Sequence, residues 1–351
     1  MIPSRLAFGT LAVALLGIFL FALRTANLGE AGRGADEGDR LDDIRSRGFL
    51  TCGVWPEVAG FSQRDEQGSY TGFDVDICRA LAAAIFETPD KIQFVEAATV
   101  QEFLELEDVD VVSRRLTWEL EREGALGLLF GPITFYDGQS FLVPRELGIT
   151  RVEQLSGKNI CVRPVSRSEV TLELHFRAKT LEMNKVLLDS TDELSDAFAS
   201  GQCQAFTEDV SMLGAIRSTL AEADAFSILP EQISKEPLAQ LVREDDDRLY
   251  DVLRWTVFAL IRAEELGVTS ENVDEMLEST DLEIKHLLGV IPGNGEALGL
   301  DERWAYNVIR ALGNYGEMFE RNVGMNSPIR MERGPNALWT SGGLMYAPPL
   351  R

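Results

Sequence analysis

The sequence predicts an α/β protein of two lobes joined by a hinge, with an apolar helix before the first lobe. Strand-like segments alternate with amphipathic helices over residues 49–112, and the same alternation restarts at residue 158. Such alternation is typical of a parallel sheet covered by helices. The pattern breaks near residues 136–143 and again near 234–241. The chain would therefore cross between the lobes twice, which suits a hinge.

The N-terminal segment, residues 1–28, contains an apolar run at 6–23 with Arg5 before it and Arg24 after it. A short positive start followed by an apolar core is typical of a secretory signal. An uncleaved membrane anchor is the alternative, because a helix over this run would span roughly 27 Å, nearly a bilayer core. Residues 29–40 are Gly-rich and polar, which predicts a flexible tether. Both alternatives place residue 41 onward outside the cytoplasm.

The first series of elements begins with a short helix at 41–45 and a buried strand at 49–54. Phe61 follows in a Gly-flanked loop. Apolar residues spaced by three and four from Ile77 to Ile85 predict a helix. Strands are predicted at 91–95 and 109–112.

The second series has strands at 158–162, 186–188 and 204–207, with helices at 168–177 and 191–200. Ser166 and Glu169 stand at the spacing of a capping box, which predicts the start of the first of these helices. The series defines the second lobe, residues 139–236, inserted into a first lobe that starts with residues 41–138.

The remainder, residues 237–351, is expected to return to the first lobe and to add a helical extension. Helices are predicted at 247–265, 272–288 and 301–321. The tail from residue 322 is rich in Gly, Pro and aromatic residues. We expect it to pack on a lobe as an extended segment and not to form a third domain.

Four cysteines are present, Cys52, Cys78, Cys161 and Cys203, and an even number in an exported chain suggests disulfides. Three pairings are possible. We favour Cys52–Cys78 and Cys161–Cys203, because each pair then lies within one lobe; four buried free thiols are the alternative. The chain has no CxxC pair and two histidines, which argues against a zinc site.

The formal net charge is −24, from 57 acidic and 33 basic side chains. Such a surface repels phosphate and anionic lipid, so no nucleic-acid partner is expected. The sequence contains no GxSxG elbow, HExxH helix or P-loop. We therefore expect no catalytic residues and no cofactor.

Several sequence blocks point to one family. Residues 72–81 (GFDVDICRAL) carry two acidic residues ahead of a helix, and further blocks lie at 233–238, 254–269, 304–317 and 346–349. Together they resemble the polar amino-acid solute-binding family, in its general L-amino-acid-binding branch, over residues 41–351. The resemblance implies a two-lobed periplasmic-binding-protein fold. It also implies a periplasmic receptor that delivers its ligand to an inner-membrane ABC permease.

A free amino acid carries a carboxylate, which an Arg fork suits, and an ammonium, which an Asp suits. The resemblance implies that Arg122, twelve residues after Asp110, clamps the carboxylate, with the Thr117 hydroxyl in the same loop. It also implies that Asp209 binds the ammonium and that Phe61 covers the ligand side chain. The alternatives are a surface ion pair for Arg122, a helix cap for Asp209 and a core position for Phe61.

Two departures from the family pattern bear on the ligand. Arg115 stands where the family has Asn, Ser or Thr, and residues 163–169 (RPVSRSE) replace a Gly-Thr-Thr-like turn. In that segment Pro164 has no amide to donate, Val165 would be strained at a positive φ, and only Ser166 keeps a hydroxyl. Either the ligand differs, for example by being more acidic, or the pocket no longer binds an amino acid. In the second case the chain would be a tethered interaction subunit of a membrane complex.

Overall fold

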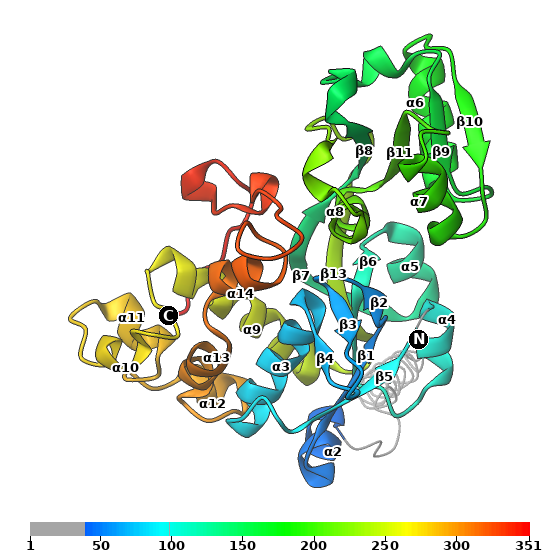
Figure 1. Ribbon diagram of the computed structural model, residues 1–351. Helices are drawn as coiled ribbons and strands as arrows, with labels where there is room; N and C mark the ends of the chain where they lie inside the picture. Colours follow the sequence, from blue (N-terminus) through cyan, green and yellow to red (C-terminus); the bar gives the residue numbers. More distant parts are fainter. Residues whose placement is uncertain (1–38, 98) are drawn as a thin grey trace, which may run out of the picture. The chain divides into compact units, whose positions relative to one another are not determined.

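Two mixed five-stranded sheets organise the chain in the computed structural model, which describes residues 39–97 and 99–351 (Figure 1). The predicted α/β fold is thereby confirmed. The expected secretory signal or anchor and almost all of the tether lie outside the described residues. Within the described part of the chain, every helix is too short or too polar to cross a membrane.

The first sheet has the strand order β5-β1-β6-β13-β7. Its strands are β1 (Leu50–Val54), β5 (Ile92–Glu96), β6 (Val111–Thr117), β7 (Leu128–Asp137) and β13 (Glu236–Arg243). β1 runs parallel to β5 and β6, whereas β13 is antiparallel to both of its neighbours. The carboxyl ends of β1 and β6 therefore meet at one edge, where α/β sheets commonly bind ligands.

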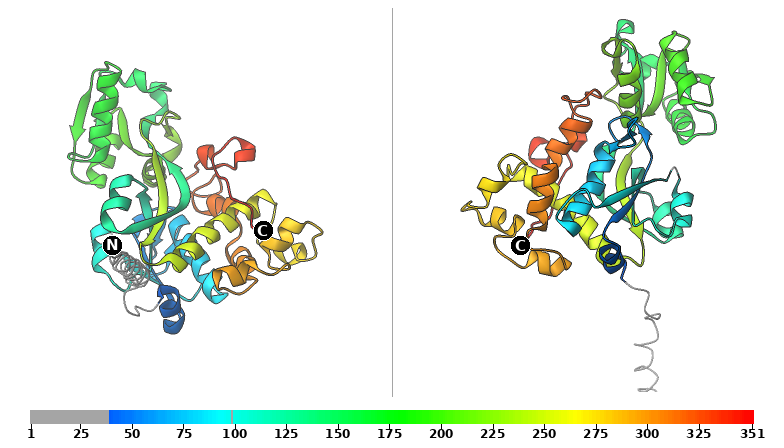
Figure 2. Two further views of the ribbon diagram at one scale, coloured as in Figure 1. Left: turned by 180° about the vertical axis from the view of Figure 1, so that it is seen from behind. Right: turned by 60° about the horizontal axis from the view of Figure 1, so that its bottom comes forward.

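Helices α3 (Phe73–Phe86) and α9 (Asp247–Glu265) pack together and share one hydrophobic core with this sheet. α13 (Trp304–Leu312) contacts both of them (Figure 2). The smaller elements are α2 (Arg40–Arg47), α4 (Val100–Glu105), α5 (Leu120–Leu126) and a three-stranded sheet of β2 (Glu57–Val58), β3 (Ser62–Arg64) and β4 (Tyr70–Thr71).

The second sheet has the order β10-β9-β11-β8-β12. Its elements are β8 (Gln139–Pro144), β9 (Asn159–Val162), α6 (Arg167–Ala178), β10 (Asn184–Leu187), α7 (Thr191–Ala199), β11 (Ala205–Asp209), α8 (Val210–Thr219) and β12 (Phe226–Ile228). Consecutive strand residues serve two cores: Phe141 packs with Phe176 of α6, and Leu142 with Phe198 of α7. This alternation is the period of two expected of a sheet covered on both faces.

The chain passes between the two sheets twice, as the sequence predicts. Only Gly138 separates β7 from β8, and the return runs from β12 to β13. The two crossings touch, because Gln139 N donates a hydrogen bond to the hydroxyl of Ser234 at 3.0 Å. A Cβ on Gly138 would lie 2.8 Å from the carbonyl oxygen of Ser234. The close approach of the crossings thus requires glycine at this position.

The C-terminal region differs from the prediction in its helix lengths. The helix expected at 272–288 is instead α10 (Val273–Met276) and α11 (Leu282–Leu287). Asp281 caps α11 by accepting from Glu283 N at 2.8 Å, so the chain restarts a helix there. The helix expected at 301–321 is split into α13 and α14 (Tyr315–Asn322). Gly313, at φ 75°, ends α13, and Asn314 opens α14 with a capping box.

The tail follows α12 (Asn294–Leu298), α13 and α14 and contains two short 3₁₀ turns, Gly334–Asn336 and Trp339–Ser341. It packs on α8, where Arg217 donates to the carbonyl of Ile329 at 2.7 Å. The described tail thus packs on its neighbours as expected, but it is not extended throughout, because two 3₁₀ turns interrupt it.

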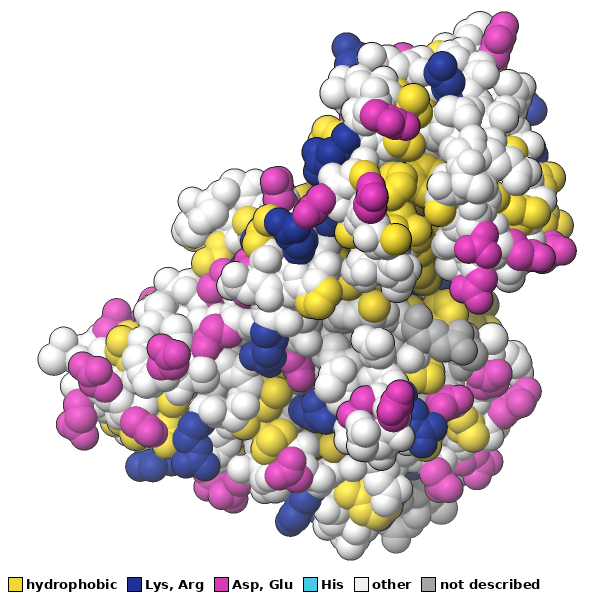
Figure 3. Space-filling view, in the orientation of Figure 1, with side chains coloured by type: hydrophobic (Ala, Val, Ile, Leu, Met, Phe, Trp, Pro, Cys, Tyr) yellow, Lys and Arg dark blue, Asp and Glu magenta, His cyan; other side chains and the backbone are white. Residues whose placement is uncertain are grey.

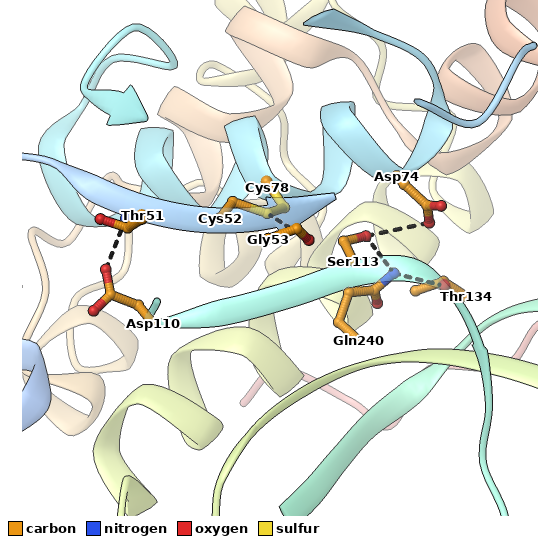
Figure 4. Close-up of a disulfide and its surroundings, with 9 residues drawn as sticks. All are labelled: Thr51, Cys52, Gly53, Asp74, Cys78, Asp110, Ser113, Thr134 and Gln240. Carbon is orange, nitrogen blue, oxygen red and sulfur yellow. Dashed lines mark hydrogen bonds between the residues drawn. A yellow bond between two sulfur atoms is a disulfide. The ribbon is translucent and has the colours of Figure 1, made fainter. Parts of the chain in front are cut away.

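The structure contains the two favoured disulfides, Cys52–Cys78 and Cys161–Cys203. The first joins β1 to α3 (Figure 4). The second joins Cys161 of β9 to Cys203, which lies two residues before β11. Each disulfide therefore ties a parallel strand to an element of the same sheet region, and no described cysteine is free.

Candidate ligand-binding site

A cavity of about 290 Å³ lies where the carboxyl ends of β1, β6, β9 and β11 meet. Parallel strands direct the loops and side chains after their carboxyl ends to one place, which is why such crevices hold ligands. The cavity is lined by Trp55, Arg114, Arg115, Leu116, Thr117, Arg122, Gln139, Arg163, Ser166, Arg167, Ser168, Glu208, Asp209, Met212 and Glu236. Five of the six ligand-binding residues predicted from the sequence are in this lining: Arg115, Thr117, Arg122, Ser166 and Asp209.

A second, larger cavity of about 510 Å³ lies between α8, β12 and the tail. It touches the carboxyl end of neither β1 nor β6, and Arg217 beside it is occupied by the carbonyls of Ile329 and Arg330. The smaller cavity is therefore the better candidate for ligand recognition.

Phe61 does not line the cavity. Its side chain is 1% exposed, and its ring packs edge-on against Phe73 and Phe135 with centroid distances of 6.2 and 5.2 Å. The Arg115 guanidinium lies 5.4 Å from the centroid of the Phe61 ring. The aromatic lining residue is instead Trp55. Trp55 directly follows strand β1, and this position at the carboxyl end of a parallel strand could have identified it as a lining residue from the sequence.

The segment predicted as a pocket loop is strand up to Thr117. β6 bulges, because Val112 and Leu116 pair with Leu241 and Ala239, so three residues of β6 face Gln240 alone. Arg115, within this bulge, has a φ of 57°, a backbone region that non-glycine residues seldom adopt. The bulge turns Arg114 and Arg115 toward the cavity, where both are lining residues.

Arg122 lies at the cavity and makes the ion pair that was the alternative interpretation from the sequence. Its Nε lies 2.9 Å from a carboxylate oxygen of Glu119, and its Nη1 donates to the carbonyl of Thr117 at 2.9 Å. It thus makes a surface ion pair and still lines the cavity. The contacts fix the guanidinium at the carboxyl end of β6.

Glu119 is held from both sides of the cavity. Besides pairing with Arg122, it accepts two hydrogen bonds from Arg167 Nη2, at 2.9 and 2.8 Å. Arg167 begins α6 beside the second sheet, whereas Glu119 precedes α5 beside the first. One carboxylate is therefore bound by a guanidinium from each side, which is the environment that a ligand carboxylate would need.

The hydroxyl of Thr117 donates to Glu236 at 2.8 Å. Glu236 is buried, accepts from Ser234 at 2.9 Å, and lies 3.7 Å from Arg167. Because Glu236 starts β13 directly after the second crossing, this contact joins the cavity to the crossing segments.

Asp209 ends β11 and stands at the N-cap position of α8, but its side chain makes no cap hydrogen bond. Asp137 takes that role by accepting from Ser211 N at 3.1 Å. The carboxylate of Asp209 instead lies 4.0 Å from Arg115 Nη2. Burial, and then the neighbouring carboxylates of Asp137 and Glu208, raise the pKa of Asp209 well above its usual value. An incoming cation would relieve this repulsion.

Loop 163–169 shows the strain expected from its sequence. Val165 has a φ of 53°, and its side chain is 99% exposed. Its amide donates to Glu169 at 2.7 Å, and the hydroxyl of Ser166 accepts from Glu169 N at 3.1 Å. The Val165 amide and the Ser166 hydroxyl are thus used within the loop. Arg163 and Arg167 are the charged side chains that this loop presents to the cavity.

Replacing Val165 by Gly should stabilise the protein by about 0.5–1 kcal/mol. The left-handed conformation costs a non-glycine residue about 1–2 kcal/mol, and the greater freedom of glycine in the unfolded chain offsets part of the gain. No packing is lost, since the Val165 side chain is exposed. Urea denaturation measures the difference. Val165→Ala, which keeps a Cβ, is the matched control and should gain less; equal gains for both variants would disprove the strain.

The two α/β sheets, the double crossing and the charged cavity at the strand ends define a class of protein, the hinged solute receptors. Comparison with known proteins agrees with this class. The chain belongs to the bacterial extracellular solute-binding proteins, family 3, whose family model matches residues 50–272.

Among its relatives, the chain is 43% identical to the general L-amino acid-binding periplasmic protein AapJ of Rhizobium johnstonii, over 91% of this chain and 95% of the relative. It is 42% identical to the glutamate/glutamine/aspartate/asparagine-binding protein BztA of Rhodobacter capsulatus, over 91% and 95%. A solved ABC transporter periplasmic binding protein from Brucella ovis, with glutathione bound, is 44% identical, with a TM-score of 0.82 over 90% of this chain and 100% of that chain.

Proposed function

We propose that this protein is the extracytoplasmic amino-acid-binding component of an ABC transporter. One observation carries the proposal: Arg122 and Thr117 line one side of the cavity, and Asp209 lines the other. The similarity to AapJ, a general L-amino acid-binding periplasmic protein, supports it. The segment at residues 1–28 would direct export to the periplasm or hold the protein at the inner membrane, where the permease is its partner.

In the proposed complex, Arg122 and Arg167 bind the ligand α-carboxylate in place of Glu119. Asp209 accepts the ammonium, assisted by the negative potential of Asp137 and Glu208. Residues 139–236 act as the lobe that rotates about the two crossings onto the remainder, 41–138 and 237–351. Because each side of the cavity supplies one guanidinium to a shared carboxylate, ligand binding and lobe closure are linked.

The ligand is proposed to be acidic. Five of the lining side chains are arginines, against three carboxylates, and the visible protein surface is otherwise rich in acidic groups (Figure 3). The cavity thus concentrates positive charge in a chain of net charge −24. Two relatives are consistent with an acidic ligand: BztA is named for glutamate and aspartate among its ligands, and the Brucella ovis protein holds glutathione.

Calorimetric titration of the purified protein with L-glutamate, L-aspartate and neutral L-amino acids tests this function. Arg122→Ala should weaken binding by about 30-fold or more, since loss of one partner of a charge pair costs about 2–5 kcal/mol. Arg64→Ala, an exposed arginine outside the cavity, is the control and should leave binding unchanged. If the folded protein binds no amino acid, the proposal is wrong, and an interaction subunit of a membrane complex takes its place.

A further inference from the structure

Arg114 differs from the other arginines of β6 and α5. Among the side chains that the structure describes, no carboxylate forms an ion pair with it, whereas Arg115 and Arg122 each have one. Its Nε is buried without a hydrogen-bond partner. Its guanidinium lies 5.6 Å from the centroid of the Trp55 ring, and both side chains line the cavity. Arg114 therefore offers donors to the cavity that no described group of the protein uses.

The surroundings of Arg114 make an anion favourable there. Burial, followed by the nearby cations Arg115 and Arg122, lowers its pKa to about 10. The carboxylates of Asp74 and Glu102 raise the pKa of Arg114, but their effect is smaller than that of burial and of the two cations. A negative group placed against Arg114 would replace water lost by burial and relieve the repulsion among the cations.

Arg163 approaches the same cavity from the second sheet. It follows β9 directly, and its Nη2 donates to the hydroxyl of Thr191 at 2.8 Å. No described carboxylate lies within ion-pair distance of it, and Glu208, which also lines the cavity, accepts a hydrogen bond from Ser168 at 3.0 Å. Arg163 thus brings a second unpaired guanidinium, from the opposite side, to the cavity that Arg114 lines.

We propose that Arg114 and Arg163 form a second anion subsite over Trp55, distinct from the Arg122–Arg167 pair that shares Glu119. This inference rests on the proposed function and specifies its ligand. The subsite takes a second carboxylate, and the ligand is therefore a compound with two carboxylates and one ammonium. The second carboxylate comes either from the side chain of an acidic amino acid or from the far end of a γ-glutamyl peptide. A neutral amide at that end leaves both guanidinium groups without a counter-ion.

Five probes separate the alternatives by calorimetry: L-glutamate, L-glutamine, glutathione, glutarate and butyrate. The first pair differs only in the second anionic group, and glutarate has two carboxylates without the ammonium. The unaltered protein should bind L-glutamate at least about 10-fold more tightly than L-glutamine. Arg163→Met should bring the ratio to about 1–3 by weakening L-glutamate alone, and Arg114→Met should do the same.

Arg163 is exposed, so its replacement tests the subsite even if Arg114→Met impairs folding. Arg151→Met, an exposed arginine that pairs with Glu153 outside the cavity, is the control and should keep the ratio. Tighter binding of glutathione than of L-glutamate, lost in Arg163→Met, assigns the subsite to the peptide, and the reverse order assigns it to the amino acid.

The outcomes also separate this inference from the proposed function. Equal affinity for L-glutamate and L-glutamine, or a glutamate preference unchanged in Arg163→Met, overturns the second subsite and leaves amino-acid binding intact. Binding of glutarate but not butyrate, in a protein that binds no amino acid, supports the paired anion subsites and overturns the proposed function. Binding of none of the five by the folded protein overturns both.

Discussion

The free energy of unfolding should decrease by about 4 kcal/mol between pH 4 and pH 8 on account of Asp74 alone. This carboxyl is 4% exposed, and burial raises its pKa from 3.8 to about 7, although Arg115, Ser113 and Arg114 act in the opposite direction. A carboxyl with a raised pKa in the folded state binds its proton more tightly there than in the unfolded chain. Its stabilising effect is complete below pH 3.8 and is lost as the pH rises through 7.

Asp74 belongs to a chain of buried, hydrogen-bonded polar side chains (Figure 4). Ser113 donates to Asp74 at 3.2 Å, and Gln240 donates to both Ser113 and Thr134 at 3.1 Å. The second carboxylate oxygen of Asp74 has no hydrogen-bond partner. The network thus joins α3 to the bulged segment of β6, to β13 and to β7, and leaves one carboxylate oxygen of Asp74 without a partner.

Urea denaturation of the unaltered protein and of Asp74→Asn, at pH values from 4 to 8, measures the effect. Asn keeps the shape and the acceptor for Ser113 but cannot titrate, so the variant should lack about 4 kcal/mol of the pH dependence. Asp90→Asn, an exposed acid, is the matched control and should follow the unaltered protein. Burial raises the pKa of Asp137, Glu208 and Asp209 too, so some dependence should remain in every variant. Parallel curves for Asp74→Asn and the unaltered protein would refute the prediction.

The sequence was sufficient for features with a local pattern. Apolar runs and helical spacing predicted β1, α3, β9 and α9, and the position of each cysteine in one series or the other predicted both pairings. The prediction of one helix at 272–288 was wrong. Apolar periodicity continues through Asp281, but the side chain of Asp281 caps a new helix, α11. The capping hydrogen bond, and not the apolar periodicity, therefore determines where this helix begins.

The lining of the cavity was predictable in part, but the contacts between its side chains were not. Arg122, Thr117 and Asp209 reach one cavity, as expected from the family resemblance. The bond from Arg167 to Glu119 joins residues 48 apart in sequence, and no local pattern encodes such a contact. Phe61 lies in a Gly-flanked loop where a lining residue was expected, but its ring packs against Phe73 and Phe135 in the core, and these contacts join residues far apart in sequence.

Replacing Cys161 and Cys203 together by Ala should destabilise the region of the second sheet by about 4 kcal/mol. The bridge closes a loop with a sequence separation of 42, and cross-linking a loop of this size removes about that much free energy from the unfolded chain. The pair Cys52–Cys78 has a separation of 26, for which about 3.5 kcal/mol is expected. The first region also shares the larger hydrophobic core, which includes α3, α9 and α13. The second region has smaller cores, so loss of its bridge should matter more.

Tryptophan positions allow the two regions to be observed separately. All five tryptophans lie outside residues 139–236: Trp55, Trp118, Trp255, Trp304 and Trp339. Tryptophan fluorescence therefore follows the first region, whereas circular dichroism follows the helices and strands of both. In Cys161→Ala/Cys203→Ala the dichroism transition should begin at lower urea than the fluorescence transition, because the second region unfolds first. Cys52→Ala/Cys78→Ala is the matched control, in which fluorescence should shift at least as far as dichroism. Coincident transitions in both variants would contradict this prediction and would mean that the two crossings couple the sheets into one cooperative unit. Any rotation about the crossings would then have to occur without partial unfolding of either region.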